Sequence, residues 1–351
     1  MSEQSTRWGG GLWAAADLVT PMAIRVAATL RLADHLAAGT HTSAALAAAV
    51  GVDHDALDRV MRHLVTAGVL AREAGGYRLT SLGEGLRDDH PDGVRAWIDL
   101  DGPIGRGDLC FVELLHTVRT GTPAFPRRFG AGFWDDLATD PDRSASFDAL
   151  MGGRLAADAP VVATALDWGA VGQVVDVGGG DGTLLIAILR EHPDLRGTVV
   201  DLAGPIARAT TALDAAGLRD RAVAHEGSFF DPLPAGAGGY LLSGVLHDWD
   251  DAHARRILQR CVEAATSTAT GSGSGAVFVV DHFAEVGGES SDDLDDATAP
   301  VDTEGDLRML CYLNGRERTL GQLGELAASA ELQVGSVTPA GTRSIVELRP
   351  R

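Results

Sequence analysis

A glycine-rich stretch, Val174-Val-Asp-Val-Gly-Gly-Gly-Asp-Gly182, has the residue types of a turn that brings a ligand against its own backbone. The residues before the glycines predict a buried strand, and residues 183–190 predict an apolar helix. Glycines permit positive φ angles and let a ligand approach the main chain closely. Backbone N–H groups and the positive end of the helix dipole would face that ligand. The stretch therefore predicts the floor of a nucleotide-type cofactor site.

Three carboxylates near this turn indicate which cofactor it could bind. Asp176 precedes the turn, Asp181 lies inside it, and Asp201 ends the next predicted strand. A carboxylate at the position of Asp201 can accept both hydroxyl groups of a ribose, as in NAD sites. The alternative role for Asp201 is that of a helix N-cap. An anionic turn suits a ligand with a positive centre and no pyrophosphate, such as S-adenosylmethionine (SAM).

Two later strand ends also carry candidate site residues. Ser228 and Phe229 follow the predicted strand 222–226, where an adenine ring could be hydrogen-bonded and stacked; the alternative for Phe229 is the apolar core. His247 follows the predicted strand 240–243. Because ligands of parallel sheets bind at the carboxyl ends of the strands, His247 is expected at the ligand edge.

His247 has the chemistry of a general base. An imidazole with an ordinary pKa of about 6.5 can be neutral at working pH and accept a proton. Asp281, at the end of a fifth strand, and Glu317 are two acids that can support it. A carboxylate on one imidazole nitrogen fixes the tautomer and raises the basicity of the other. The alternative for Glu317 is a surface ion pair with Arg316 or Arg318.

The elements that must position these residues alternate between short β-branched runs and helices from about residue 168. This pattern predicts an α/β fold with a Rossmann-like parallel sheet covered on both faces. The expected strands are 174–177, 197–201, 222–226, 240–243, 276–280 and 344–348, and the expected helices are 183–190, 204–216, 251–265 and 320–330. Two polar segments, 266–275 and the strongly acidic 287–306, are expected to be loops, the second of them mobile.

The N-terminal part predicts a helical, winged-helix-like module. Pro21–Leu36 is expected to form one helix whose wide apolar face packs against other elements or a second subunit, which predicts a homodimer. Helices at 44–50 and 56–67 precede a hairpin of 69–72 and 77–80. The second helix carries no basic stripe, and the net charge of −20 argues against nucleic acid or an anionic membrane as a partner.

An aromatic-rich helical segment precedes the α/β part and could wall a pocket for a flat ligand. Phe133, Trp134 and Met151 are its first candidates, and packing between domains is the alternative. Either Arg106 or Arg154 could hold a carboxylate of the ligand. The remaining candidates for this pocket are Asp158, Met309 and Tyr312.

Composition excludes several classes of protein. The 351 residues and 45% hydrophobic content are typical of a globular chain with ample core. Three widely spaced cysteines form neither a disulfide framework nor a zinc motif, so we expect a reducing compartment, the cytoplasm, and no metal. We find no signal-peptide pattern and no apolar run of membrane-spanning length.

Taken together, five motifs resemble the SAM-dependent small-molecule O-methyltransferases that have an N-terminal dimerisation domain, the family of the plant caffeate-type enzymes. A bacterial branch acts in antibiotic biosynthesis, and the chain is most similar to naphthoate O-methyltransferases of enediyne pathways. The motifs, in family order, are Asp176–Gly182, Gly227–Pro234, Leu246–Trp249, Asp306–Leu310 and Gly315–Thr319. The resemblance implies a dimerisation domain over 1–100, a helical linker with the substrate pocket over 101–165, and a SAM-binding catalytic domain over 166–351.

The resemblance also implies roles for single residues. His247 would be the general base, flanked by Asp281 and Glu317. Cofactor contacts would come from Asp176, Gly178, Gly180, Asp201, Leu202, Gly227, Ser228, Phe229, Phe230, Ser243 and Trp249. Two positions depart from the family pattern: Ser228 stands where an Asp is frequent, and Asp281 replaces a frequent Glu, which shortens its reach toward His247.

The predicted function is methyl transfer from SAM to a phenolic hydroxyl of an aromatic natural-product intermediate, leaving S-adenosylhomocysteine (SAH). A C- or N-methyltransferase or a SAM-using hydroxylase on the same fold is the alternative within the class. A winged-helix regulator that senses SAM or another ligand is the alternative of another class. An NAD-dependent oxidoreductase is disfavoured by Asp181 in the turn and by the late position of His247.

Overall fold

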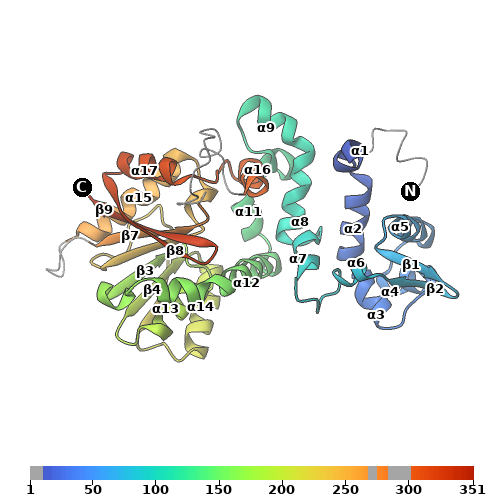
Figure 1. The fold of residues 1–351 in the computed structure, drawn as a ribbon, viewed down its shortest axis with the longest axis horizontal. Helices are drawn as coiled ribbons and strands as arrows, with labels where there is room; N and C mark the ends of the chain where they lie inside the picture. The colour runs from blue at the N-terminus through green and yellow to red at the C-terminus, as the bar shows by residue number, and fades with distance from the viewer. Residues whose placement is uncertain (1–10, 268–274, 284–301) are drawn as a thin grey trace, which may run out of the picture. The chain divides into compact units, whose positions relative to one another are not determined.

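The computed structural model describes residues 11–267, 275–283 and 302–351, and it divides into two compact units, Met1–Leu109 and Cys110–Arg351 (Figure 1). Among the residues that it places, no helix has both the length and the apolar character needed to cross a membrane.

The first unit is helical with one small hairpin, which follows the helices as predicted. Its apolar core gathers side chains from α2, α3, α4, α5 and the hairpin, including Leu32, Leu46, Met61, Leu64 and Tyr77. The elements are α1 (Gly11–Ala16), α2 (Val19–Thr29), α3 (Leu32–Ala37), α4 (Ser43–Val50), α5 (His54–Thr66), β1 (Leu70–Glu73), β2 (Gly76–Leu79), α6 (Ser81–Glu84), α7 (Val94–Ile98) and α8 (Pro103–Asp108).

The single helix expected over 21–36 is wrong, because the chain breaks between α2 and α3. Arg31 adopts a left-handed φ of 52°, and the N–H groups of Leu30 and Arg31 donate to the carbonyls of Val26 and Ala28 as at a helix end. Arg31 then forms ion pairs with Asp34 and Asp88. The break turns α3 so that the expected apolar face is buried inside this unit.

The second unit contains a seven-stranded sheet in the order β5-β4-β3-β6-β7-β9-β8. The first five strands in this order are parallel, and β9 and β8 are antiparallel to their neighbours. The strands are β3 (Gln173–Val177), β4 (Arg196–Asp201), β5 (Ala222–Glu226), β6 (Gly239–Ser243), β7 (Ala276–Asp281), β8 (Leu332–Ala340) and β9 (Arg343–Pro350). The strand order reverses between β3 and β6, and ligands of such sheets bind at this switch point.

Helices cover both faces of the sheet, as the alternating pattern predicts (Figure 1). One core cluster joins the sheet to α12 (Pro141–Ala165), α13 (Thr183–Glu191) and α14 (Ala203–Ala215). The other joins it to α15 (Asp251–Thr266) and α17 (Leu320–Ser329). A capping box between Thr319 and Gln322 starts α17.

A separate aromatic cluster lies among the helices before the sheet and α16 (Thr303–Tyr312). The helices are η1 (Leu109–Glu113), α9 (Leu114–Thr120), α10 (Ala124–Phe129) and α11 (Phe133–Ala138). Phe133 stacks on Tyr312 with ring centroids 5.6 Å apart, and Phe125 packs against Phe133 at 5.3 Å.

The loop predicted over 287–306 is wrong at its end, where α16 begins at Thr303. The Asp302 side chain accepts a hydrogen bond from the Gly305 N–H. Asp302, which the sequence assigns to the acidic loop, is therefore the N-cap of α16. The rest of that segment, through residue 301, and residues 268–274 of the other predicted loop lie outside the described residues.

Candidate active site

The glycine turn after β3 lies at the switch point of the sheet and requires a glycine at its start. Gly178 has φ 74°, and a Cβ atom placed there would lie 2.8 Å from Cγ2 of Val245 and 3.5 Å from the ring of Phe229. A Cβ atom on Gly180 would meet no atom within 4 Å. The turn is therefore closed toward β6 at Gly178 and open at Gly180, which leaves room for a ligand.

Asp201 and Asp176 place two carboxyl groups beside this turn. Asp201 Oδ2 accepts from the Gly180 N–H at 2.9 Å, and Oδ1 accepts from the Leu202 N–H at 2.7 Å. The helix N-cap is Leu202, so the N-cap alternative for Asp201 is wrong. Asp176 is 1% exposed, and neither of its carboxyl oxygens has a hydrogen-bond partner within the described chain. Burial, followed by the charges of Asp201 and Asp181, raises the pKa of Asp176 to about 7.

Half-buried aromatic side chains form a wall next to the turn. Phe230 packs edge-on against Trp249 with centroids 4.8 Å apart, and Phe229 lies 5.7 Å from the same indole. Ser228 Oγ accepts a hydrogen bond from the Phe230 N–H at 3.2 Å. The Ser243 hydroxyl, at the end of β6, is buried without a partner among the residues that the structure places.

His247 lies in the short helix η3 (Leu246–Asp248) just after β6, surrounded by carboxylates. Its Nδ1 is 3.1 Å from Glu317 Oε1 and 3.8 Å from Asp281 Oδ1, and its Nε2 is 3.5 Å from Asp248 Oδ1. The Glu317 contact has the distance of an ion pair but not the alignment of a hydrogen bond. The structure thus brings together the three predicted catalytic residues and adds Asp248.

The carboxylates govern the protonation of His247. Burial alone lowers the pKa of His247, but the facing carboxylates of Asp281, Asp248 and Glu317 outweigh it and raise the pKa from 6.5 to about 10. The ordinary imidazole pKa that the sequence led us to expect for His247 is therefore wrong. Burial also raises the pKa of Asp248 to about 7, against the lowering effect of His247. These groups share protons, so they titrate as one cluster.

Sequence reasoning missed one residue of the site, Asp248, whose only signal in the sequence is its place next to His247. A short 3₁₀ turn brings the Asp248 carboxyl group back to the imidazole, and residue types do not predict such a turn. His247, Asp281 and Glu317 also offer one ligand atom each within 4.8 Å of one another, a spacing that a metal ion could bridge. Clusters of acidic groups with this spacing also occur in proteins that bind no metal ion there.

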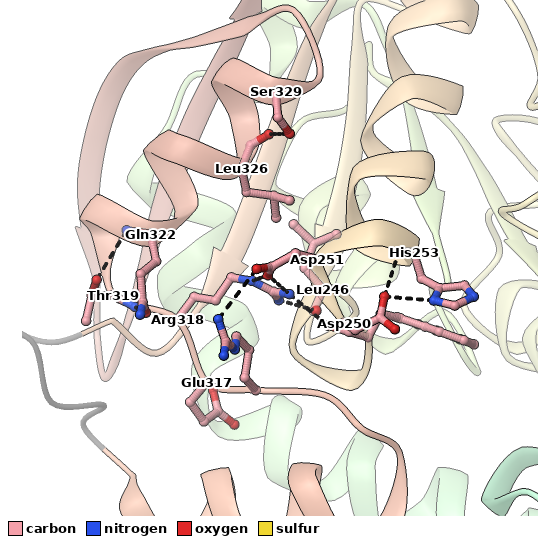
Figure 2. A network of polar contacts seen from close by, with 12 residues as sticks. Leu246, Asp250, Asp251, His253, Glu317, Arg318, Thr319, Gln322, Leu326 and Ser329 are labelled. Carbon is pink, nitrogen blue, oxygen red and sulfur yellow. Dashed lines mark hydrogen bonds and ion pairs between the residues drawn. The ribbon is translucent and has the colours of Figure 1, made fainter. Parts of the chain in front are cut away.

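Glu317 points toward His247, and the two arginines beside it do not pair with it. Arg316 and Arg318 both contact the carboxylate of Asp251. In Figure 2, Arg318 extends toward Asp251 and Leu246, and the Glu317 side chain leaves the chain on another side. The alternative of a surface ion pair for Glu317 is therefore wrong.

The predicted substrate-binding residues lie in different parts of the fold. Phe133, Trp134 and Tyr312 belong to the aromatic cluster, where Trp134 Nε1 is buried with no partner in the described chain. Met151 and Met309 are half-buried on α12 and α16, and Arg154 is exposed on α12. Arg106 lies on α8 in the first unit. Asp158 instead forms an ion pair with Arg343 at 3.0 Å and bonds to Thr342, so its expected place in the pocket finds no support.

Comparison with known proteins decides the family. Residues 111–333 match the O-methyltransferase domain, and residues 13–87 match the O-methyltransferase dimerisation domain. The chain belongs to the O-methyltransferase family. The family assignment and the predicted fold, a class I SAM methyltransferase domain with an N-terminal dimerisation domain, are confirmed.

Relatives of this O-methyltransferase come from bacterial natural-product pathways. A 2,7-dihydroxy-5-methyl-1-naphthoate 7-O-methyltransferase of Streptomyces carzinostaticus is 54% identical over 339 residues, 96% of this chain and 97% of that protein. Aclacinomycin 10-hydroxylase RdmB of Streptomyces purpurascens is 46% identical over 334 residues, 94% of this chain and 85% of that protein. A crystal structure of NcsB1, an O-methyltransferase from neocarzinostatin biosynthesis in complex with SAH and 1,4-dihydroxy-2-naphthoic acid, superposes with a TM-score of 0.89. It is 52% identical and covers 97% of this chain and 99% of that one.

The protein is a SAM-dependent O-methyltransferase and not a regulator, as the sequence predicts. The roles of single residues stay predictions, as do the bounds of the three predicted domains. What the structure adds is a fit to the cofactor: an open glycine turn, a buried carboxyl group and a buried hydroxyl that lack partners in the described chain, and an aromatic wall.

The buried carboxyl of Asp176 predicts a pH-dependent cost to stability. Its pKa is raised from 3.8 to about 7, so the folded state favours the protonated form. Stability is then lost as pH rises from about 4 through 7, by an amount on the order of 2–4 kcal/mol. Asp176→Asn should therefore raise the melting temperature of the ligand-free enzyme more at pH 8.5 than at pH 5. Asp194→Asn, at an exposed acid, is the control, and a gain from Asp176→Asn that is equal at both pH values would contradict the account.

Proposed function

We propose that this enzyme methylates a phenolic hydroxyl of a hydroxynaphthoate-type acceptor, with His247 as general base. The observation that carries the proposal is the position of His247. It follows β6, the neighbour of β3 at the switch point of the sheet, and it has carboxylates facing both imidazole nitrogens. The acceptor class is supported by the 54% identical naphthoate 7-O-methyltransferase and by the naphthoic acid bound to NcsB1.

SAM, when bound, supplies a methyl group already activated by a sulfonium. Asp201 would hold the ribose, because each carboxylate oxygen uses one lone pair on a backbone N–H and keeps another for a hydroxyl. Phe229, Phe230 and Trp249 would flank the adenine, with Ser228 and Leu202 at its edge. Gly178, Gly180, Gly227, Asp176 and Ser243 would line the rest of the cofactor site.

His247 would take the phenolic proton while the phenol oxygen forms its bond to the methyl carbon. A phenol has a pKa of about 10, and the carboxylates that raise the pKa of His247 toward this value bring proton transfer from the phenol closer to balance in free energy. In the ligand-free enzyme His247 is largely protonated at neutral pH. With a cationic cofactor bound beside the cluster, the pKa of His247 would fall and its proton would leave. Glu317 and Asp281 would then stabilise the imidazolium that forms during transfer.

The aromatic cluster and its flanking residues supply the proposed acceptor pocket. Phe133, Trp134 and Tyr312 offer ring faces, and the partnerless indole N–H of Trp134 can donate to an acceptor oxygen. Met151 and Met309 would add apolar surface. A carboxylate on the acceptor would pair with Arg154, and Arg106 stays the alternative expected from the sequence.

The proposal includes a homodimer in a reducing compartment, the cytoplasm. The dimerisation domain supports the dimer, as do exposed apolar side chains at the start of the first unit: Leu12, Trp13, Leu18 and Val19. Cys110, Cys261 and Cys311 are buried thiols that form no disulfide with one another, which suits a reducing environment.

The acceptor class is tested by incubating the enzyme with SAM and a panel of hydroxynaphthoic acids and anthracycline phenols, followed by mass spectrometry. We expect hydroxynaphthoates to gain one methyl group with EDTA present, because the sulfonium needs no metal to activate its methyl carbon. Addition of an oxygen atom instead of a methyl group would favour the hydroxylase function of RdmB. Turnover that needs added Mg²⁺, or that occurs only with anthracyclines, would contradict the proposal.

The base is tested by His247→Ala. Loss of the proton acceptor should lower kcat by roughly 10²–10⁴-fold, whereas isothermal titration should show SAM binding within a few-fold of the wild type. His54→Ala, at an exposed histidine of the first unit, should leave turnover unchanged. Wild-type turnover in His247→Ala would remove His247 from the mechanism.

A further inference from the structure

Arg318 is a buried cation that no step of the proposed mechanism uses. Its side chain is 4% exposed. It donates to the Leu246 carbonyl at 2.6 Å, to the Trp249 carbonyl at 2.8 Å, and to Asp251 Oδ1 at 2.8 and 3.2 Å (Figure 2). Burying a charge is costly unless its donors are satisfied, so a guanidinium with three acceptors at this depth is part of a built arrangement.

The two carbonyls that Arg318 holds lie on either side of His247. The turn between them is weakly bonded internally: the Asp248 and Trp249 N–H groups reach their acceptors at 3.3 Å each. A third carbonyl, that of His247 itself, accepts from the Arg316 N–H at 2.8 Å. Residues 316–318 therefore hold three carbonyls of the 246–249 turn from outside.

A close backbone approach shows that this contact is specific. A Cβ atom on Gly315 would lie 2.1 Å from the His247 carbonyl oxygen, so no larger residue fits there without a shift. The next residue but one, Glu317, places its carboxylate 3.1 Å from the His247 imidazole, and its N–H donates to Asp306 at 2.9 Å. The segment that contacts the His247 backbone therefore also carries Glu317, whose carboxylate faces the His247 imidazole.

The Trp249 carbonyl extends this link to the cofactor side. The Trp249 ring packs edge-on against Phe230 at 4.8 Å in the aromatic wall. One guanidinium therefore joins the backbone on the base side, at Leu246, to the backbone on the wall side, at Trp249.

We propose that Arg318 is a positioning residue that sets the distance of the His247 imidazole from Glu317 and from the cofactor wall. The inference rests on the proposed role of His247. Arg318 acts through the backbone and contacts neither reactant. Small misplacements of a base cost large factors in rate, because transfer requires a short, aligned contact.

The contacts explain why this position needs arginine. A planar guanidinium presents several N–H donors in a fixed fork, whereas a lysine ammonium on a flexible stem would not reach both carbonyls in one geometry. The ion pair with Asp251 contributes less, because the Asp251 side chain is 61% exposed and solvent screens it. The two carbonyl contacts carry the positioning.

The test compares Arg318→Met and Arg318→Lys with Arg316→Met. Arg316 is the matched control: it lies two residues away and contacts the same Asp251, but its side chain is 52% exposed and holds no carbonyl of the turn. We expect both Arg318 variants to lower kcat by roughly tenfold or more and to move the pH limb of kcat toward ordinary imidazole values, since the carboxylates no longer hold the ring. Arg316→Met should stay within about twofold in kcat and keep the wild-type limb.

A double-mutant cycle separates positioning from general damage. In a His247→Ala background, Arg318→Lys should cost less than about twofold in the residual rate, because the ring that Arg318 positions is gone. An equal loss in both backgrounds, or a wild-type pH limb in Arg318→Lys, would overturn the proposal. If Arg318→Met does not fold, Arg318→Lys alone decides, since it keeps a charge at the site. Wild-type turnover in His247→Ala would instead be a failure of the proposed function.

Discussion

One imidazole among three carboxylates is the constraint on which the site depends. A histidine that faces Asp281, Asp248 and Glu317 within 3.8 Å is held as a strong base, and its pKa of about 10 is close to that of a phenol. The same field that makes it basic keeps it protonated at neutral pH when no other cation is near. On the proposed mechanism, a positively charged methyl donor bound beside His247 would offset that field.

The fold assembles this cluster from segments that are far apart in the chain. The carboxyl ends of β6 and β7 bring His247 and Asp281 to one edge of the sheet, and the segment between α16 and α17 adds Glu317. Arg318 and Gly315 hold that segment against the His247 turn. The glycine turn reaches the same edge from β3 because the strand order reverses between β3 and β6.

Much of this arrangement could be read from residue types. Short β-branched runs that alternate with helices located the parallel strands, and the rule that ligands bind at their carboxyl ends placed Asp201, His247 and Asp281 at one edge. Features that depend on tertiary contacts could not be read. The break at Arg31 has no glycine or proline to mark it, β8 has no clear alternation, and the burial of Arg318 follows from carbonyls some 70 residues earlier in the chain. The proposed acceptor pocket draws its residues from several helices, so no single pattern could predict it.

Carboxylates raise the pKa of His247, and we propose that the positive charge of the cofactor lowers it again. NMR titration of the His247 imidazole, assigned by its loss in His247→Asn, measures this directly in the free enzyme and in its complexes with SAM and with SAH, which lacks the sulfonium charge. We predict a pKa well above 6.5 in the free enzyme, a clear decrease with SAM and a smaller one with SAH. A pKa near 6.5 in the free enzyme, or equal values with SAM and SAH, would contradict the account.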